Sequence, residues 1–122
     1  MGVEQLIPLG RIAFNTPDAA TGVKVGKLPK GWVVVGFLTR IKTAFNAASS
    51  NAVLLGIEDN TDEYLDGDDT VAGTTGYKTA TTVTCPFDVG DADIDVYAAY
   101  TQTGTAATAG VAEFWAKVVK ID

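Results

Sequence analysis

The sequence predicts an all-β, single-domain β-sandwich or jelly-roll of six to eight strands, with at most one short helical turn. Three observations predict this class. Short segments alternate apolar, β-branched or aromatic residues with polar ones. Clusters of Gly, Pro, Asn and Asp separate these segments, and none shows the periodicity of an amphipathic helix. A length of 122 residues fits one domain, so residues 1–122 are expected to form a single unit.

The first quarter of the chain predicts an edge strand and a loop. Pro8 cannot donate a hydrogen bond to a sheet, so residues 1–10 are expected to be an edge strand or an N-terminal arm. A short strand with Ile12 and Phe14 on alternate positions follows. Residues 16–22 read as a loop, and residues 23–25 as at most a three-residue strand.

The most apolar stretch, residues 28–59, predicts a hairpin of two strands joined by the polar turn at residues 46–51. The first strand, residues 32–45, is rich in β-branched and aromatic residues. Alternation divides its side chains between a core face, Val33, Val35, Phe37, Thr39, Ile41 and Thr43, and an outer face, Trp32, Val34, Leu38, Arg40 and Lys42.

The second half of the chain predicts a loop followed by three strands. Residues 60–76 read as a loop with one possible helical turn at residues 62–66. Residues 77–87 predict a strand with a polar face, in which the lone Cys85 serves packing. The last two strands lie within residues 91–101 and 111–121. Their expected core faces carry Ile94, Val96, Ala98 and Tyr100 in the first, and Phe114, Ala116 and Val118 in the second.

Composition argues against an enzyme. The chain has no histidine, the commonest general base and zinc ligand, and no phosphate-binding glycine motif. The acidic segment at residues 62–67 has the glycine of an EF-hand loop, but Tyr64 stands at its third ligand position and Gly73 where the closing glutamate should be. The segment at residues 91–95 has Val96 in place of the glycine and Gln102 in place of the closing glutamate. We therefore expect no catalytic residues, no cofactor and no metal.

Charge and hydropathy restrict the expected partners. A formal net charge of −6 repels phosphate backbones, so nucleic acid is not an expected partner. The longest uncharged apolar run, residues 31–39, is far shorter than the ~20 residues of a membrane helix, and no cleavable leader is recognisable. We expect a protein that does not bind membranes.

Three large aromatic side chains, those of Trp32, Tyr97 and Trp115, fall by alternation on faces opposite the core. Such side chains either cover a second buried face or form a contact patch, because Trp and Tyr supply most interface hot spots. If two of them cluster, the patch would exceed what a monomer normally exposes, and the chain would form an oligomer.

Several short motifs follow one another in a distinctive order: FNT at residues 14–16, GKLPKG at 26–31, a valine-rich strand ending in TAFNA at 43–47, VLLGIED at 53–59 and DEYL at 62–65. This order resembles that of small virion proteins of tailed bacteriophages, of the capsid decoration or cement type.

This resemblance implies a structural protein that braces the outside of a phage head. Its partners would be the major capsid protein and further copies of itself, with a homotrimer favoured over a homodimer. Its location would be the outer capsid surface of the virion, after assembly in the host cytoplasm. The candidate capsid or subunit contacts are Val3, Leu6, Ile7, Pro8, Trp32, Val34, Arg40, Lys42, Tyr97 and Trp115.

Alternatives from other classes remain open from the sequence. One is a carbohydrate-binding β-sandwich, or an adhesion protein of the phage tail or fibre, in which Trp32, Tyr97 and Trp115 stack on sugars and residues 91–95 hold calcium. Another is a small enzyme with a pair of acids in a cleft. Its candidate acids are Asp62, Glu63, Asp93 and Asp95.

Overall fold

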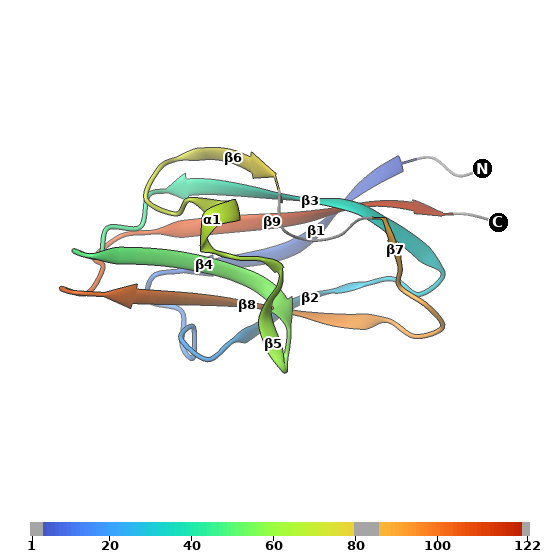
Figure 1. Ribbon diagram of the computed structural model, residues 1–122, viewed down its shortest axis with the longest axis horizontal. Coiled ribbons are helices and arrows are strands. Elements are labelled where there is room, and N and C mark those ends of the chain that lie inside the picture. Colours follow the sequence, from blue (N-terminus) through green and yellow to red (C-terminus); the bar gives the residue numbers. More distant parts are fainter. Residues whose placement is uncertain (1–3, 80–85, 121–122) are drawn as a thin grey trace.

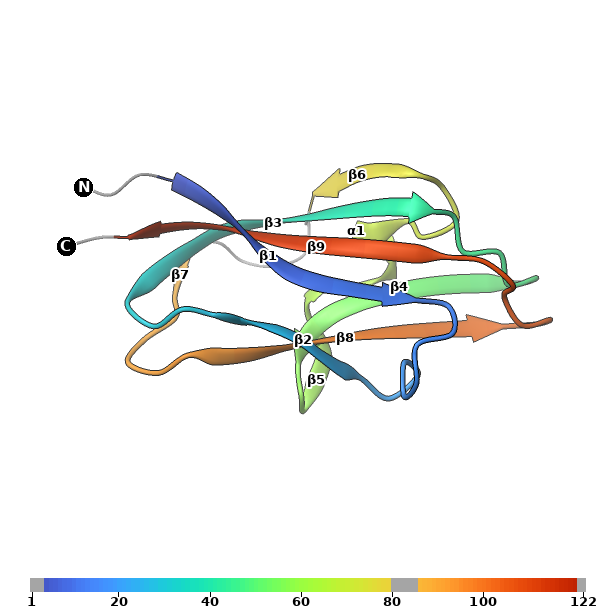
Figure 2. The same ribbon diagram turned by 180° about the vertical axis from the view of Figure 1, so that it is seen from behind.

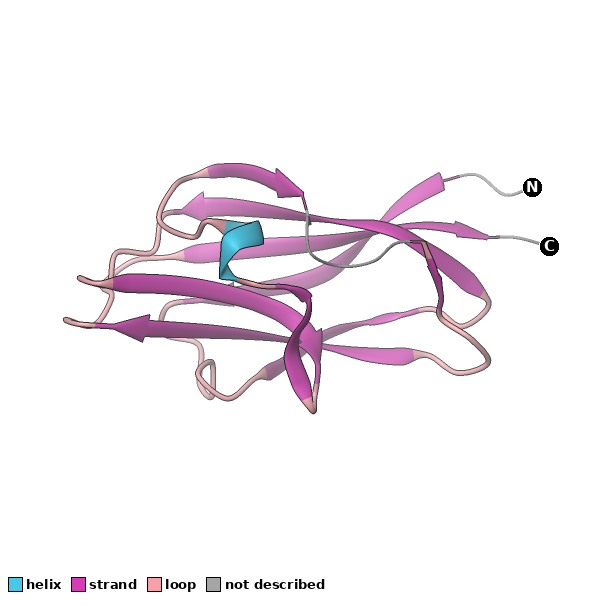
Figure 3. Cartoon of the chain, viewed as in Figure 1, coloured by secondary structure: helices cyan, strands magenta, loops and turns pink. Residues whose placement is uncertain are grey.

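Two antiparallel sheets pack face to face in the computed structural model, which describes residues 4–79 and 86–120 (Figure 1). Strands dominate this part of the chain, and one short helix accompanies them (Figure 3). The predicted all-β sandwich is confirmed, with nine strands where six to eight were expected. The elements are β1 (Glu4–Ala13), β2 (Val23–Leu28), β3 (Trp32–Thr43), β4 (Ser50–Ile57), β5 (Asn60–Leu65), α1 (Gly67–Thr70), β6 (Gly76–Thr79), β7 (Phe87–Asp88), β8 (Ile94–Thr103) and β9 (Val111–Lys120).

The strands pair from the two ends of the chain inwards. β1 pairs with β9, β2 with β8, β3 with both β6 and β7, and β4 with β5. The pairings β3–β9 and β4–β8 complete a first sheet in the order β1-β9-β3-β6, with β7 also beside β3, and a second sheet in the order β2-β8-β4-β5 (Figure 2). Because β6 and β7 share one flank of β3, the nine strands fill eight positions. This nested pairing is the jelly-roll arrangement.

The predicted hairpin at residues 28–59 is wrong. β3 belongs to the first sheet and β4 to the second, so the two strands do not pair. Each has one apolar face, with Phe37 and Ile41 buried on β3 and Val53 and Leu55 buried on β4. Two such faces exclude more apolar surface from water when they pack against each other across the sandwich than when they lie edge to edge.

A β-bulge in β3 reverses the faces of its first residues. The register against β9 shifts between Val34 and Gly36, so one extra residue interrupts the alternation. Val34 is therefore fully buried, and Trp32 packs against the core, although both were expected on the outer face. Beyond the bulge, the predicted burial of Phe37, Thr39 and Ile41 is confirmed, whereas Val33 and Val35 are only half-buried and Thr43 is exposed.

Aromatic side chains from both sheets fill the core. The rings of Phe37, Tyr64 and Phe87 stack with centroids 4.8 to 6.4 Å apart, and those of Phe45 and Tyr100 lie 4.5 Å apart. The predicted core faces of β8 and β9 are confirmed: Val96, Ala98, Tyr100, Phe114, Ala116 and Val118 are buried, and Ile94 packs against them.

The segment after β4 differs from the sequence prediction. Residues 60–65 form strand β5 instead of a loop with a helical turn, because Tyr64 and Leu65 are buried against the core. The helical turn lies further on, in α1, beside β4 and β6. Part of the strand predicted at residues 77–87 forms β6 and β7. Residues 80–85, and with them the packing expected of Cys85, lie outside the described residues.

The N-terminal segment is an edge strand, one of the two predicted options. β1 lies at the edge of the first sheet, and Pro8 occupies a position opposite Trp115. β1 also passes close to β2, because a Cβ added at Gly10 would lie 2.5 Å from the Val25 carbonyl oxygen. The strand β2 extends over Val23–Leu28 and is longer than predicted.

Two buried threonines allow a matched test of core polarity. The Thr39 hydroxyl has no hydrogen-bond partner within the described part of the chain, whereas the Thr70 hydroxyl donates to the Val53 carbonyl oxygen at 2.9 Å. Replacing Thr39 with Val should raise the free energy of unfolding by about 1 kcal/mol, because it removes an unsatisfied polar group. The substitution Thr70→Val should lower it by about 1 kcal/mol or more. Urea denaturation of both variants checks this, and a loss of stability in Thr39→Val would contradict it.

Candidate interaction surface

The face of the first sheet that points away from the second sheet gathers apolar and aromatic side chains from three strands. Residues directly opposite each other in neighbouring strands share a face. The register places Trp115 of β9 between Pro8 of β1 and Leu38 of β3, and Lys117 of β9 between Leu6 of β1 and Gly36 of β3. We call this surface the outer face of the first sheet.

An aromatic and cationic cluster lies at the β6 side of this face. Tyr77 is 64% exposed, and its ring centroid lies 6.4 Å from that of Trp115. The guanidinium of Arg40 lies 5.8 Å from the centre of the Tyr77 ring and 3.5 Å from a carboxylate oxygen of Glu113. These contacts hold Tyr77 and Arg40 in place on an exposed surface.

A hollow of about 350 Å³ lies on the same face where the bulge in β3 leaves a glycine. A Cβ added at Gly36 would meet no atom within 4 Å, so the missing side chain is what opens this space. Leu6, which is 51% exposed, forms part of the rim. The hollow is lined by Leu6, Val35, Gly36, Phe37, Leu38, Thr79 and Lys117, and we call it the Gly36 hollow.

The outer face differs in charge from the rest of the molecule. Strand register and alternation give it four basic and three acidic side chains, Arg11, Arg40, Lys42, Lys117, Glu4, Asp88 and Glu113. Two of the acids lie close to bases, Glu4 at 3.8 Å from Lys117 and Glu113 at 3.5 Å from Arg40. The remaining sequence has five basic and twelve acidic residues. The excess negative charge therefore lies away from this face.

The structure brings together some of the residues that the sequence indicated as contacts. Leu6, Pro8, Arg40 and Trp115 share the outer face, and Lys42 is exposed at the end of β3. The other candidates lie elsewhere: Ile7 and Trp32 pack against the core, Val34 is inside it, Tyr97 is half-buried on β8 of the second sheet, and Val3 is outside the described residues.

Several residues of the surface were absent from the sequence-based candidates, among them Leu38, Gly36 and Tyr77. Leu38 could have been found from the sequence, because alternation within its strand places it on the outer face. Gly36 could also have been found, because a glycine inside an apolar strand is a sequence signal of a β-bulge. Tyr77 could not be found in this way, because its position depends on the pairing of β6 with β3.

The three aromatics that the sequence offered as contact or sugar-stacking residues, Trp32, Tyr97 and Trp115, are separated. Trp115 is on the outer face of the first sheet, Trp32 packs against the core, and Tyr97 belongs to the second sheet. They therefore do not form one stacking platform for a sugar chain.

The acidic residues proposed for an enzyme or a calcium site make separate local contacts. An Asp93 carboxylate oxygen accepts a hydrogen bond from the Lys30 N–H at 2.9 Å, Asp95 lies 3.2 Å from the Lys24 ammonium, and Glu63 accepts from the Asn60 amide. Within residues 4–79 and 86–120, no group of three His, Cys, Asp or Glu side chains is arranged to hold a metal ion.

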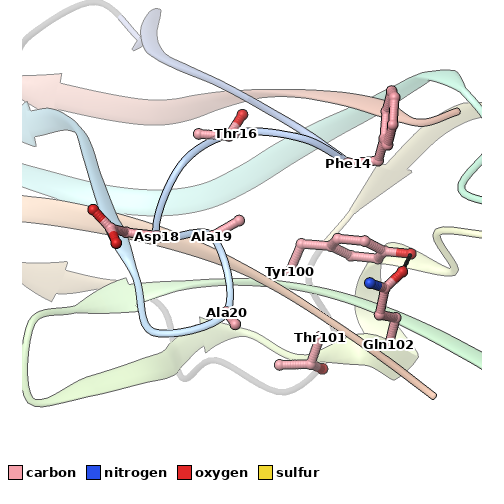
Figure 4. A pocket seen from close by; sticks show the side chains of 8 residues that line it. All are labelled: Phe14, Thr16, Asp18, Ala19, Ala20, Tyr100, Thr101 and Gln102. Carbon is pink, nitrogen blue, oxygen red and sulfur yellow. Dashed lines mark hydrogen bonds between the residues drawn. The ribbon is translucent and has the colours of Figure 1, made fainter. Parts of the chain in front are cut away.

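A second hollow, of about 530 Å³, lies between the loop at residues 14–22 and the end of β8 (Figure 4). The Tyr100 hydroxyl interacts with the side-chain oxygens of Asn51 and Gln102, and burial raises the pKa of this phenol. The Asp18 carboxylate points away from Tyr100 (Figure 4). Through these contacts Tyr100 orders the Asn51 and Gln102 side chains. The pKa of Tyr64 is also raised, by burial and then by the charge of Glu63.

Comparisons with known proteins find similar structures only. No protein-family model matches the sequence, and no curated protein matches it. A chain in the structure described as the cyanophage Pam1 capsid asymmetric unit superposes with a TM-score of 0.75 and 22% identity, over 98% of this chain and 86% of that chain.

A second solved structure, described as the acidic stable capsid structure of Helicobacter pylori bacteriophage KHP30, contains a chain with a TM-score of 0.53 and 17% identity. This match covers 98% of the present chain and 99% of the other. At these identities the two matches show a shared fold. In the described part of the chain, no helix is long and apolar enough to span a membrane.

Proposed function

We propose that this chain is a structural virion protein that binds the outer surface of a phage head as an oligomer and stabilises the capsid. Its partners are the major capsid protein and further copies of the chain, with a homotrimer favoured over a homodimer. It acts by binding and not by catalysis, and it joins the head in the host cytoplasm.

The observation that carries the proposal is the likeness in fold to chains of two phage capsid structures. The likeness extends over 98% of this chain in both cases, so the whole domain has a counterpart and not only a common motif. A jelly-roll by itself serves many functions. The printed descriptions of both structures name phage capsids, and this agrees with the family that the sequence motifs resemble.

The surface of the molecule supports a binding role. Its outer face exposes Leu6, Tyr77 and the Gly36 hollow next to charged side chains, which is the mixture found in protein contacts. A protein that binds many equivalent positions on a shell stabilises that shell by mass action, even where each contact is weak.

Binding to phage heads tests the proposal directly. Purified full-length protein is mixed with heads that lack it, and the heads are sedimented. We expect saturable co-sedimentation, and we expect saturated heads to release their DNA at a higher temperature than bare heads. A non-homologous acidic protein of similar size serves as the control. Heads that neither bind the protein nor gain heat resistance would refute the proposal.

A further inference from the structure

We infer that the outer face of the first sheet is the contact between copies of this chain, with Tyr77 of one copy seated in the Gly36 hollow of the next. This inference deepens the proposed function, because it assigns the oligomer contact to particular residues. It concerns the protein alone and is testable without phage heads.

The first argument is that the face carries both parts of an apolar contact. Tyr77 is exposed over 64% of its surface and lies beside Trp115 and Arg40, so its ring is accessible on the outer face. The Gly36 hollow, at about 350 Å³, has room for an aromatic ring. If the partner were a different protein, this chain would need either the exposed ring or the hollow, because the partner would supply the other. When identical chains associate in this way, each chain must carry both the ring and the hollow.

The second argument is charge. Two copies of a protein with a formal net charge of −6 repel each other at most surfaces. The outer face has four basic and three acidic side chains, and its Arg40–Glu113 and Lys117–Glu4 pairs offer both signs to a facing copy. Of the surfaces of this acidic molecule, this one therefore lets two copies approach with little repulsion.

The third argument is that exposed apolar side chains concentrate here. Among the described residues, the large hydrophobic side chains that remain strongly exposed are Leu6, Val71 and Tyr77, and two of these three belong to the outer face. Leu6 forms part of the rim of the Gly36 hollow, next to where the ring of Tyr77 would enter. Burying both against a second copy removes this apolar surface from water.

Two variants disrupt the contact from opposite sides. Tyr77→Ser removes the ring, and Gly36→Val fills the hollow without striking a neighbouring atom at its Cβ. In sedimentation equilibrium, the wild type should form a dimer or trimer. Each variant alone should dissociate with a constant at least tenfold higher, the loss expected of an interface hot spot.

Mixing the two variants gives the sharpest result. Tyr77→Ser keeps an intact hollow and Gly36→Val keeps an intact ring. An equimolar mixture should therefore form a one-to-one complex that is tighter than the association of either variant alone. The control Val71→Ser removes an exposed apolar side chain elsewhere and should keep the wild-type mass. Circular dichroism melting verifies that all variants are folded.

The outcomes separate this inference from the proposed function. A wild type that stays monomeric, or variants that keep the wild-type mass, would overturn the assignment of the copy-to-copy contact. If such a monomer still binds and stabilises phage heads, the capsid-binding part of the proposed function stands without the oligomer. If the wild type forms this oligomer but does not bind phage heads, the assigned contact stands and the proposed function is refuted.

Discussion

Replacing Gly110 with Ala should lower the free energy of unfolding by about 4 kcal/mol, the largest effect that we expect of a single methyl group in this protein. A Cβ at this position would lie 2.3, 2.5 and 2.7 Å from three atoms of the Phe45 ring. Phe45 is 2% exposed and its ring lies 4.5 Å from that of Tyr100, so it has little room to move aside. The φ of Gly110, +148°, adds backbone strain for any residue with a side chain.

The substitution Gly90→Ala is the control that separates these two causes. Gly90 has a φ of +94°, but a Cβ there would meet no atom within 4 Å. It should therefore cost only the strain, about 1 kcal/mol. Guanidinium denaturation of both variants measures the difference. Equal losses at the two positions would mean that Phe45 moves freely and that the core around it is loosely packed.

The sequence predicted those features of the fold that depend on alternation within one strand. The buried faces of β8 and β9 follow from the period of two, and the edge position of β1 is consistent with Pro8, which lacks an N–H. These predictions need no knowledge of which strand lies alongside. These predictions therefore do not depend on the topology of the sheets.

The prediction of a hairpin was wrong because it rested only on the local sequence of the turn and its flanking strands. Residues 46–51 favour a turn, but turn chemistry does not determine whether the chain returns along the same sheet or crosses to the other. The pairings that decide the matter join distant segments, β3 to β9 and β4 to β8. In a jelly-roll, most partners are of this kind, so neighbouring strands in the sequence often belong to different sheets.

The candidate surface was predicted only in part, because it too depends on pairings between strands that are distant in the sequence. Leu6, Pro8, Arg40 and Trp115 were recognised singly from their strands, but the face they share with Tyr77 exists only through the pairing of β1, β9, β3 and β6. The β-bulge in β3 also changed which of its residues face the core. The bulge at Gly36 moved Val34 and Trp32 into or against the core and left the hollow on the outside.

The second large effect concerns Gly56 in β4. Replacing Gly56 with Ala should lower the free energy of unfolding by about 3 kcal/mol, because the new Cβ would lie 2.2 Å from the Asn60 carbonyl oxygen and 2.7 Å from the Glu63 nitrogen. Both are backbone atoms of β5, so no rotation of a side chain can relieve the contact. β5 must shift away, which weakens its pairing with β4 and the packing of Tyr64 against Phe37.

Gly36→Ala provides the matched control for this prediction, since it also adds a methyl group inside a strand but meets no atom within 4 Å. It should be neutral or raise the free energy of unfolding by up to about 1 kcal/mol, because alanine loses less conformational entropy on folding than glycine. Urea denaturation compares the two variants, and amide hydrogen exchange shows where the structure opens. In Gly56→Ala, protection should fall first at residues 60–65. Unchanged protection there, together with a large loss of stability, would mean that the strain spreads through β4 into the core and is not confined to the β4–β5 pair.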